Sequence, residues 1–176
     1  MTSIHSLDVQ NQRVNDYPLW TALVTPFNQD GSIDYPSLRN IAERQSFAGN
    51  AILLLGSTGE GLALSSEEQF AIVKFVCNLS LDVPIMVAVG GTNLPSQLSW
   101  IAQCNNLSID AYLLATPIYA KPGPVGQTQW FNALLDAAQH PCMLYNVPSR
   151  SGVEIPVETV KALQEHPNCW AMKEAS

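Results

Sequence analysis

The stretch "AILLLGSTGEGLALSSEEQFAIVKFVCNLS", residues 51–80, decides the fold class. It opens with an apolar run of strand length, passes through a glycine-rich turn and continues into a helical pattern. Ser65 and Glu68 have the spacing of a capping box at the start of that helix. One helix face then carries an apolar stripe, at Phe70, Val73 and Cys77. The stretch is therefore predicted to form one unit of β-strand, turn and α-helix.

The same alternation continues on both sides of this unit. Further apolar runs of strand length are "WTALVTPF" (20–27), "PIMVAVG" (84–90), "AYLLAT" (111–116), "CMLYNV" (142–147) and "CWAMKE" (169–174). Helical patterns occupy residues 34–49, 94–106, 126–139 and 156–166, with Gly49 placed as a C-cap and Pro156 near a first turn. Because the apolar runs are nearly continuous, the strands are predicted to be buried on both faces, as in parallel sheets.

The chain is predicted to be α/β, with a parallel sheet of six strands and about five helices between them. An open doubly wound sheet and a (β/α)8 TIM barrel both fit, and the barrel takes eight strands and about 250 residues. No GxGxxG follows the first strand, which argues against the dinucleotide-binding form of the open sheet. In a barrel, this chain would supply only about the first six βα strands. Residues 1–16 are predicted to be a polar, loosely ordered leader, and residues 17–176 the barrel portion.

Composition restricts the classes of function. The chain has 176 residues, of which 47% are hydrophobic and 13% charged, and a net charge of −7. That composition suits one globular domain and argues against a nucleic-acid or anionic-membrane partner. No run approaches the roughly 18 apolar residues of a membrane span, and the polar start lacks a signal-peptide core. The four cysteines, without metal-site spacing, are predicted to be small buried thiols of a cytoplasmic protein: Cys77, Cys104, Cys142 and Cys169.

The unusual residues gather where the predicted strands end. Five segments follow strands in this way: "LGSTGEG", "GGTN", "TPIYAKP", "YNVPSR" and "KEAS". In parallel α/β folds the carboxyl ends of the strands share one edge, and the active site lies there. We therefore expect these segments to converge on one site, and this convergence is stronger evidence than any single motif.

Lys173 is the lysine that lies inside a predicted strand, where burial of an ammonium group is costly. The other lysines lie in helical patterns or in a loop: Lys74, Lys121 and Lys161. With a two-residue period, Lys173 should share a strand face with the small residues Cys169 and Ala171. A desolvated lysine can attack a carbonyl as a neutral amine and form a Schiff base. The structural alternative is an ion pair with Glu174 or Glu60.

Other strand ends carry groups suited to proton transfer or anion binding. Tyr145 can relay protons, although a core tyrosine with a backbone partner is the commoner case for a tyrosine considered alone. The planar guanidinium of Arg150 can bind a carboxylate through two hydrogen bonds. The structural alternative is an arginine that is merely exposed on the surface. The "GSTGE" turn offers backbone N–H groups and the hydroxyls of Ser57 and Thr58 to a small anion, or is an ordinary βα turn. Glu60 is expected to order this turn rather than to react.

Four motifs in this order and spacing, "TALVTPF", "GSTGE", "YNVPSRSG" and "KEAS", resemble the dihydrodipicolinate synthase / N-acetylneuraminate lyase family over residues 17–176. The resemblance implies a TIM barrel and a class I, pyruvate-dependent lyase, cytoplasmic, usually homotetrameric and without a cofactor or metal. Its synthase members condense pyruvate with L-aspartate-4-semialdehyde to give 4-hydroxy-tetrahydrodipicolinate, in lysine and diaminopimelate biosynthesis. That reaction is the one expected here.

The same resemblance implies roles for individual residues. Lys173 would form the Schiff base with pyruvate, and Tyr145 would relay protons above it. Thr58 would link Tyr145 to a second tyrosine, matched here by Tyr119, which in this family enters the site from the neighbouring subunit. Ser57 and Thr58 would hold the pyruvate carboxylate.

Arg150 matches the arginine that receives the carboxylate of aspartate-semialdehyde in the synthases. Sialic-acid lyases resemble this chain through "GSTGE" and "YN-P" but generally lack that arginine. A sugar-acid aldolase, such as N-acetylneuraminate lyase or 2-keto-3-deoxygluconate aldolase, is therefore the weaker alternative. An inactive truncated fragment that acts only in assembly is another, favoured by the missing strands and disfavoured by the complete set of site residues.

The chain also departs from the family's pattern. Ser57 stands where synthases more often have threonine, and Ile118 precedes Tyr119 where lysine-inhibited members tend to have another tyrosine. The positions Gly61, Leu62, Ser66 and Gln69 do not form a polar lysine-binding set. Feedback inhibition by lysine is therefore expected to be weak or absent. Family members continue past "KEAS" through two more strands and a C-terminal helical region, so the chain is expected to be a piece of a longer protein or a truncated form.

Overall fold

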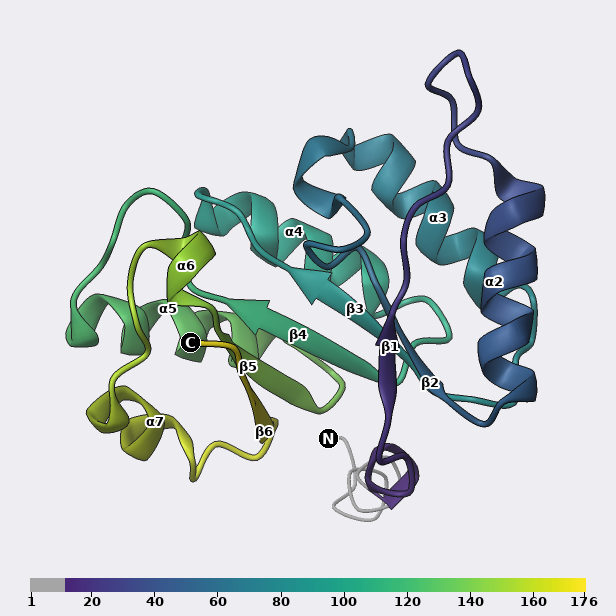
Figure 1. The fold of residues 1–176 in the computed structure, drawn as a ribbon. Helices are drawn as coiled ribbons and strands as arrows, with labels where there is room; N and C mark the ends of the chain where they lie inside the picture. The colour runs from purple at the N-terminus through teal and green to yellow at the C-terminus, as the bar shows by residue number, and fades with distance from the viewer. Residues whose placement is uncertain (1–11) are drawn as a thin grey trace. The chain divides into compact units, whose positions relative to one another are not determined.

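A computed structural model describes residues 12–176, and the leader residues 1–11 lie outside the described part. All six predicted strands are present: β1 (Trp20–Ala22), β2 (Ala51–Leu54), β3 (Ile85–Val89), β4 (Ala111–Ala115), β5 (Cys142–Asn146) and β6 (Cys169–Glu174) (Figure 1). The predicted helices are also present: α2 (Tyr35–Phe47), α3 (Ser66–Cys77), α4 (Leu94–Cys104), α5 (Pro124–Ala137) and α7 (Val157–Leu163). Two short elements were not predicted, the 3₁₀ helix η1 (Gly61–Ala63) and the helix α6 (Pro148–Ser151).

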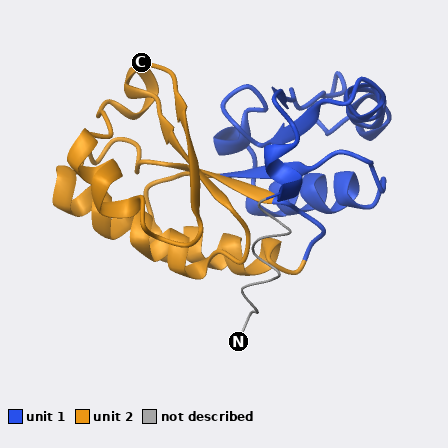
Figure 2. Ribbon diagram, turned by 90° about the horizontal axis from the view of Figure 1, so that it is seen from below, with its two compact units in different colours: residues 1–88, 107–110 blue, residues 89–106, 111–176 orange. Residues whose placement is uncertain are grey.

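The chain divides into two compact units, which Figure 2 shows in different colours. Unit 1 comprises residues up to 88 together with 107–110, and unit 2 comprises residues 89–106 and 111–176. In unit 1, β1 pairs in parallel with β2 and β2 with β3. In unit 2, β4 pairs in parallel with β5 and β5 with β6. The strands lie in chain order, and a helix follows each strand from β1 to β5, which confirms the predicted repeat of βα units.

The helices of unit 1 begin and end where the local chemistry predicts. The Ser65 hydroxyl accepts from the Glu68 backbone N–H at 3.2 Å, and the Glu68 carboxylate accepts from the Ser65 backbone N–H at 2.8 Å. This is the predicted capping box, and it satisfies N–H groups that have no partner within the helix. At the carboxyl end of the preceding helix, α2, Ala48 is the cap residue and Gly49 follows with a φ of 71°. Gly49 thus takes the left-handed position for which a glycine was predicted.

The start of the described chain is more ordered than predicted. Residues 12–15 form a helical turn, and Val14 is fully buried. The Arg13 Nε lies 3.2 Å from the Asp110 carboxylate. The expectation of a loosely ordered leader is therefore wrong for residues 12–16, because an apolar side chain and an ion pair hold this turn in unit 1.

The prediction of strands buried on both faces holds for β2 and fails for β6. All four residues of β2 are buried, whereas the residues of β6 are half-buried or exposed. Strand β6 pairs with β5 on one side and lies at the end of the strand order in the described part of the chain. An edge strand is covered by fewer neighbours, so an apolar sequence alone does not determine how deeply it is buried.

The cysteines are free thiols, as predicted, but only two of them are fully buried. Cys104 and Cys142 are buried, whereas Cys77 and Cys169 are half-buried. Burial, together with the charge of Asp110, raises the pKa of the Cys77 thiol to about 11. Within residues 12–176, none of the helices has the length and apolar character needed to span a bilayer.

Candidate active site

Strand register in unit 2 places Tyr145 and Lys173 side by side. Ala115 of β4, Tyr145 of β5 and Lys173 of β6 are successive register partners. Register partners on neighbouring strands point their side chains to the same face of the sheet. The Lys173 Nζ accordingly lies 4.5 Å from the centroid of the Tyr145 ring. An amine and a phenol from two strand ends thus form the centre of the candidate site.

This pair occupies the face of the unit 2 sheet opposite to the helix-covered one. On the helix-covered face, Tyr112 is fully buried, and its hydroxyl donates to the Asn105 side chain at 2.8 Å, at the end of α4. Along β5, buried residues alternate with half-buried ones, and Tyr145 is among the half-buried ones. The Lys173 and Tyr145 side chains therefore lie on the more accessible face, where a small molecule can reach them.

A β-bulge in β6 corrects one prediction about Lys173. Cys142 pairs with Cys169, but the next residue, Met143, pairs with Ala171, so Trp170 is an additional residue in the strand. The extra residue reverses the alternation of faces. Cys169 therefore shares the face of Cys142, whereas Ala171 shares the face of Lys173 as predicted. A strict two-residue period predicts the wrong face for Cys169, because the amino-acid types in the strand do not reveal the position of a bulge.

Lys173 is half-buried rather than fully buried, and the alternative of an ion pair with the neighbouring carboxylate is not observed. The Glu174 carboxylate accepts from the Asn146 side chain at 3.0 and 2.9 Å and from the Ser176 backbone N–H at 2.8 Å. The hydrogen bond from Asn146, followed by those from Ser176, lowers the pKa of Glu174. Within the described residues no carboxylate pairs with Lys173.

Arg150 lies on the short helix α6, directly after β5. The helix ends at Gly152, whose φ of 74° reverses the chain, and the Ser151 hydroxyl donates to the backbone oxygens of Val147 and Val153 at 3.1 and 2.7 Å. Arg150 itself is exposed and forms no ion pair with any residue in the described range. Its guanidinium is therefore available to an anion from solution.

Tyr119 lies in the loop between β4 and α5, in an unusual backbone conformation. It has a φ of 68°, and its side chain is 90% exposed. The ends of this loop are tied to α5, because the Trp130 indole N–H donates to the Ala115 oxygen at 3.0 Å and the Gln127 amide donates to the Pro122 oxygen at 3.0 Å. The loop thus presents the Tyr119 ring to the outside of unit 2.

The "GSTGE" turn of unit 1 is compact and exposes its two hydroxyl side chains. The Gly59 N–H donates to the Gly56 oxygen at 3.0 Å, and the Thr25 hydroxyl donates to the Gly59 oxygen at 2.6 Å. Ser57 and Thr58 are both exposed. The turn therefore leaves these two hydroxyls free to contact a small anion.

Glu60 does not order this turn through its side chain, contrary to the prediction. It is exposed, has a φ of 55° and makes no side-chain capping bond to η1. The 3₁₀ helix η1, which follows the turn, is held by Gln69 of α3, whose amide donates to the Gly61 and Leu64 oxygens at 2.8 and 3.1 Å.

Comparison with known proteins decides the family. The sequence model of the dihydrodipicolinate synthetase family matches residues 17–176. The chain belongs to this family. A 4-hydroxy-tetrahydrodipicolinate synthase of Francisella philomiragia is 53% identical to it over 171 residues, which are 97% of this chain and 56% of that protein. The chain therefore spans little more than half the length of the curated relatives that it matches.

Solved structures of the dihydrodipicolinate synthetase family confirm the fold class. The pyruvate complex of dihydrodipicolinate synthase from Acinetobacter baumannii matches with a TM-score of 0.86 and 34% identity, over 90% of this chain and 55% of that one. The lysine-bound synthase from Cyanidioschyzon merolae matches with a TM-score of 0.86 and 31% identity, over 91% of this chain and 56% of that one. The predicted fold, the first six strands of a TIM barrel, is thus confirmed.

Of the site residues expected from the family resemblance, unit 2 brings Tyr145 and Lys173 into contact. Ser57 and Thr58 adjoin each other in the turn of unit 1, and in unit 2 Arg150 is exposed on α6 and Tyr119 on the loop between β4 and α5. Within the described residues, no cluster of three or more His, Cys, Asp or Glu side chains is arranged to hold a metal ion. The residues expected from the resemblance carry an amine, phenols, hydroxyls and a guanidinium.

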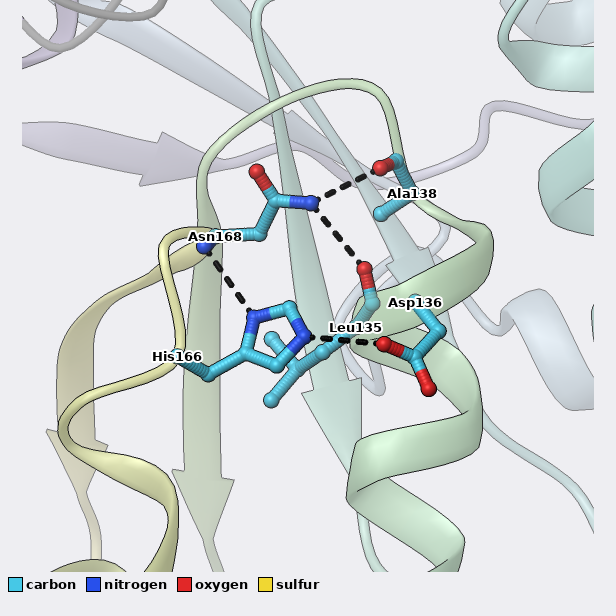
Figure 3. Close-up of polar contacts among 5 residues, drawn as sticks. All are labelled: Leu135, Asp136, Ala138, His166 and Asn168. Carbon is cyan, nitrogen blue, oxygen red and sulfur yellow. Dashed lines mark hydrogen bonds and ion pairs between the residues drawn. The ribbon is translucent and has the colours of Figure 1, made fainter.

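Two polar clusters that brace β6 were not predicted from the sequence. Asn146 and Glu174 form one at the carboxyl end of the strand. The other lies at its amino end, where the Asn168 amide donates to the Leu135 and Ala138 oxygens of α5 and its cap at 3.0 and 2.9 Å (Figure 3). Asn146 and Glu174 do lie within two of the family motifs, "YNVPSRSG" and "KEAS". Their contact could not be predicted from that, because cross-strand partners are distant in sequence.

A histidine–aspartate pair belongs to the cluster at the amino end of β6. Figure 3 shows the His166 ring between Asp136 and the Asn168 backbone. The His166 Nδ1 accepts from the Asn168 N–H at 3.1 Å, and Nε2 lies 3.1 Å from the Asp136 carboxylate. Because Nδ1 is an acceptor, the ring proton is on Nε2 and points at Asp136. The pair joins the end of α5 to the start of β6.

Proposed function

We propose that this chain provides the pyruvate-binding part of a class I lyase, a 4-hydroxy-tetrahydrodipicolinate synthase. The observation that carries the proposal is the pair formed by the Lys173 Nζ and the Tyr145 ring, 4.5 Å apart. A lysine amine beside a phenol is what Schiff-base chemistry with a keto acid requires. Relatives that bear this synthase name, and a solved relative in complex with pyruvate, support the assignment.

The first half of the reaction forms the nucleophile. The neutral Lys173 amine attacks the keto carbon of pyruvate, and the carbinolamine loses water to give an imine. Tyr145 transfers protons to and from the carbinolamine oxygen during these steps. Loss of a proton from the methyl carbon then converts the imine into an enamine. The exposed hydroxyls of Ser57 and Thr58 would hold the pyruvate carboxylate, and Thr58 would link Tyr145 to Tyr119 in a proton path.

The second half forms the carbon–carbon bond. The enamine carbon attacks the aldehyde carbon of L-aspartate-4-semialdehyde, whose carboxylate is held by the exposed guanidinium of Arg150. The amino group of that substrate then attacks the imine carbon, closes the ring and releases the Lys173 amine. The product is 4-hydroxy-tetrahydrodipicolinate, in lysine and diaminopimelate biosynthesis. We propose that residues 17–176 form the barrel portion of each subunit in a cytoplasmic homotetramer. The exposed ring of Tyr119 would complete the site of a neighbouring subunit.

Borohydride trapping tests the covalent step. The purified protein is incubated with pyruvate and sodium borohydride, digested and analysed by mass spectrometry. We expect a reduced pyruvate adduct on the peptide that carries Lys173, and none in Lys173→Ala. Lys161→Ala, which removes an exposed lysine of α7, is the control. Its Lys173 should be labelled to the same extent as in wild type. A folded protein without an adduct at Lys173 would sink the proposal.

Substitution of Arg150 tests the aldehyde substrate. In Arg150→Ala we expect the KM for aspartate-semialdehyde to rise at least about tenfold, because a charge-assisted bidentate hydrogen bond is lost. Labelling of Lys173 by pyruvate should persist, since Arg150 is assigned to the second substrate. An unchanged KM, or faster turnover of a sugar aldehyde than of aspartate-semialdehyde, would contradict this assignment and favour a sugar-acid aldolase.

A further inference from the structure

The last residue of β5, Asn146, joins the strand that carries Lys173 to the segment that follows Arg150. It is 5% exposed and directly follows Tyr145. We propose that Asn146 is a positioning residue, which holds Lys173 against Tyr145 through its hydrogen bonds to Glu174. The proposal rests on the Schiff-base function proposed above, and it assigns to Asn146 a role in the formation of the imine.

The donor half of the Asn146 amide holds the end of β6. Its nitrogen donates to both carboxylate oxygens of Glu174, at 3.0 and 2.9 Å. Asn146 and Glu174 are register partners, directly after the partners Tyr145 and Lys173. The strand end is also held by its backbone, because the Ala175 N–H donates to the Asn146 oxygen at 3.0 Å. A hydrogen bond to a charged group thus fixes the register one residue beyond the reacting amine.

The acceptor half of the same amide holds the segment after α6. The Asn146 side-chain oxygen accepts from the Ile155 N–H at 2.9 Å. Ile155 is buried, and it ends the short segment that leaves the helix carrying Arg150. One buried side chain therefore constrains two strand ends and this segment at once.

The site requires an amide, because it needs a donor and an acceptor on one short side chain. In Asn146→Asp, the new carboxylate would still accept from the Ile155 N–H, but it could no longer donate to Glu174. The hydrogen bond from Asn146 lowers the pKa of Glu174, so the native partner is an ionised carboxylate. The two adjacent carboxylates of the variant would repel each other, and the end of β6 would move away from β5.

A reversal of donor and acceptor provides the test. In the double variant N146D/E174Q, the new glutamine amide at position 174 can donate to the new carboxylate at position 146, and Ile155 keeps its acceptor. The double variant has the net charge of wild type. With the single variants N146D and E174Q it completes a double-mutant cycle.

The measured quantity is the rate at which the pyruvate imine forms on Lys173, read by borohydride quenching at timed intervals with saturating pyruvate. We expect N146D to react about tenfold more slowly per folded molecule, the scale of a lost hydrogen bond to a charged group. We expect N146D/E174Q to recover most of that loss. Folded protein is measured by thermal unfolding and by near-ultraviolet circular dichroism.

Asn168→Asp is the matched control. It makes the same change of residue at the other end of β6, where the Asn168 amide donates to the Leu135 and Ala138 oxygens. We expect this variant to lower the Tm while the imine rate per folded molecule stays close to that of wild type. Equal slowing of both variants would point to general loosening of β6 and would contradict the proposal.

Three further outcomes would overturn the proposal. A folded N146D that reacts as fast as wild type would show that Asn146 does not position Lys173. A double variant with wild-type Tm that reacts about tenfold more slowly than wild type would show the same, and this comparison does not require N146D to fold. Absence of any adduct at Lys173 in wild type would overturn the proposed function and this inference together, whereas an adduct with unaffected variants overturns the inference alone.

Discussion

Lys173 lies beside Tyr145 because β5 and β6 are parallel and paired in register, although the two residues are distant in the sequence. The two side chains point to the same face of the unit 2 sheet, and the Lys173 Nζ lies 4.5 Å from the ring centroid. The neighbouring residues, Asn146 and Glu174, point to the other face and satisfy each other. The alternation of side chains along the two strands thus separates the pair proposed to react, Lys173 and Tyr145, from the pair that braces the strand ends.

Tyr145→Phe distinguishes the contribution of the aromatic ring from that of the hydroxyl group. The phenylalanine keeps the ring beside Lys173 but removes the hydroxyl that would transfer protons. We expect kcat to fall about 100-fold, the scale of a lost general acid–base catalyst, with little change in Tm. Steady-state kinetics and thermal unfolding measure the two quantities.

Tyr35→Phe is the control for that variant. Tyr35 belongs to α2, and its ring packs on Phe75 with 4.8 Å between centroids. We expect wild-type kinetics from it. Equal rates in Tyr145→Phe and wild type would show that the phenol takes no part in the reaction.

The "GSTGE" turn shows how one glycine sets the shape of an element. A Cβ at Gly59 would lie 2.8 Å from the Leu23 backbone oxygen, closer than real Cβ contacts allow. We expect Gly59→Ala to lower the free energy of unfolding by about 1–3 kcal/mol, since backbone atoms of the turn and of the Leu23 segment must move apart. Chemical denaturation measures the change.

Gly123→Ala is the matched control for the turn. No atom lies within 4 Å of a Cβ built at Gly123, and its φ of −71° suits any residue. We expect its stability to stay within about 0.5 kcal/mol of wild type, as for most surface substitutions. An equal loss in both variants would contradict the argument from close backbone approach.

Helix α3 carries a thiol whose titration should affect stability. Burial raises the pKa of Cys77 from 9.0 to about 11. Between these values the unfolded chain loses the thiol proton while the folded chain keeps it, so stability falls as pH rises through this window. We expect Cys77→Ala to show a shallower decline in stability than wild type over this same window, measured by denaturation experiments.

Part of that decline should remain in Cys77→Ala. Burial also raises the pKa of Cys142 and Cys169, so these thiols contribute with the same sign. An identical slope in Cys77→Ala and wild type would show that Cys77 does not titrate differently in the folded state.

At the scale of the whole molecule, the family membership raises the question of regulation by lysine. The synthase from Cyanidioschyzon merolae has been crystallised with lysine bound. In this chain Leu62 is 60% exposed and apolar, and the amide of Gln69 already donates to the Gly61 and Leu64 oxygens. These residues offer little to an ammonium or carboxylate group, which supports the expectation of weak feedback.

We expect the rate of the proposed condensation to be retained at millimolar lysine. Initial rates with pyruvate and aspartate-semialdehyde are compared with and without lysine, and arginine at equal ionic strength is the control. Clear inhibition by lysine but not by arginine would show that the expectation is wrong.

Much of the fold followed from sequence because its signals are local. The capping box at Ser65 and Glu68, the glycine after α2 and the continuous apolar run of β2 each depend on residues near one another in the chain. Capping and strand propensity act over a few residues, and the repeat of such signals predicted the βα architecture. Most candidate site residues were identified in the same way, from motifs at strand ends, whereas Tyr119 came from the family resemblance alone.

The tertiary structure decided what depends on partners that are distant in sequence. Cross-strand register placed Lys173 beside Tyr145, and the bulge at Trp170 moved Cys169 to the opposite face. The half-burial of β6 and the hydrogen bonds of Asn146 likewise follow from strand pairing. The sequence by itself determined which residues carry the proposed chemistry and which elements hold them. Their contacts were settled only by the packing of strands, because no local rule specifies which groups meet across a sheet.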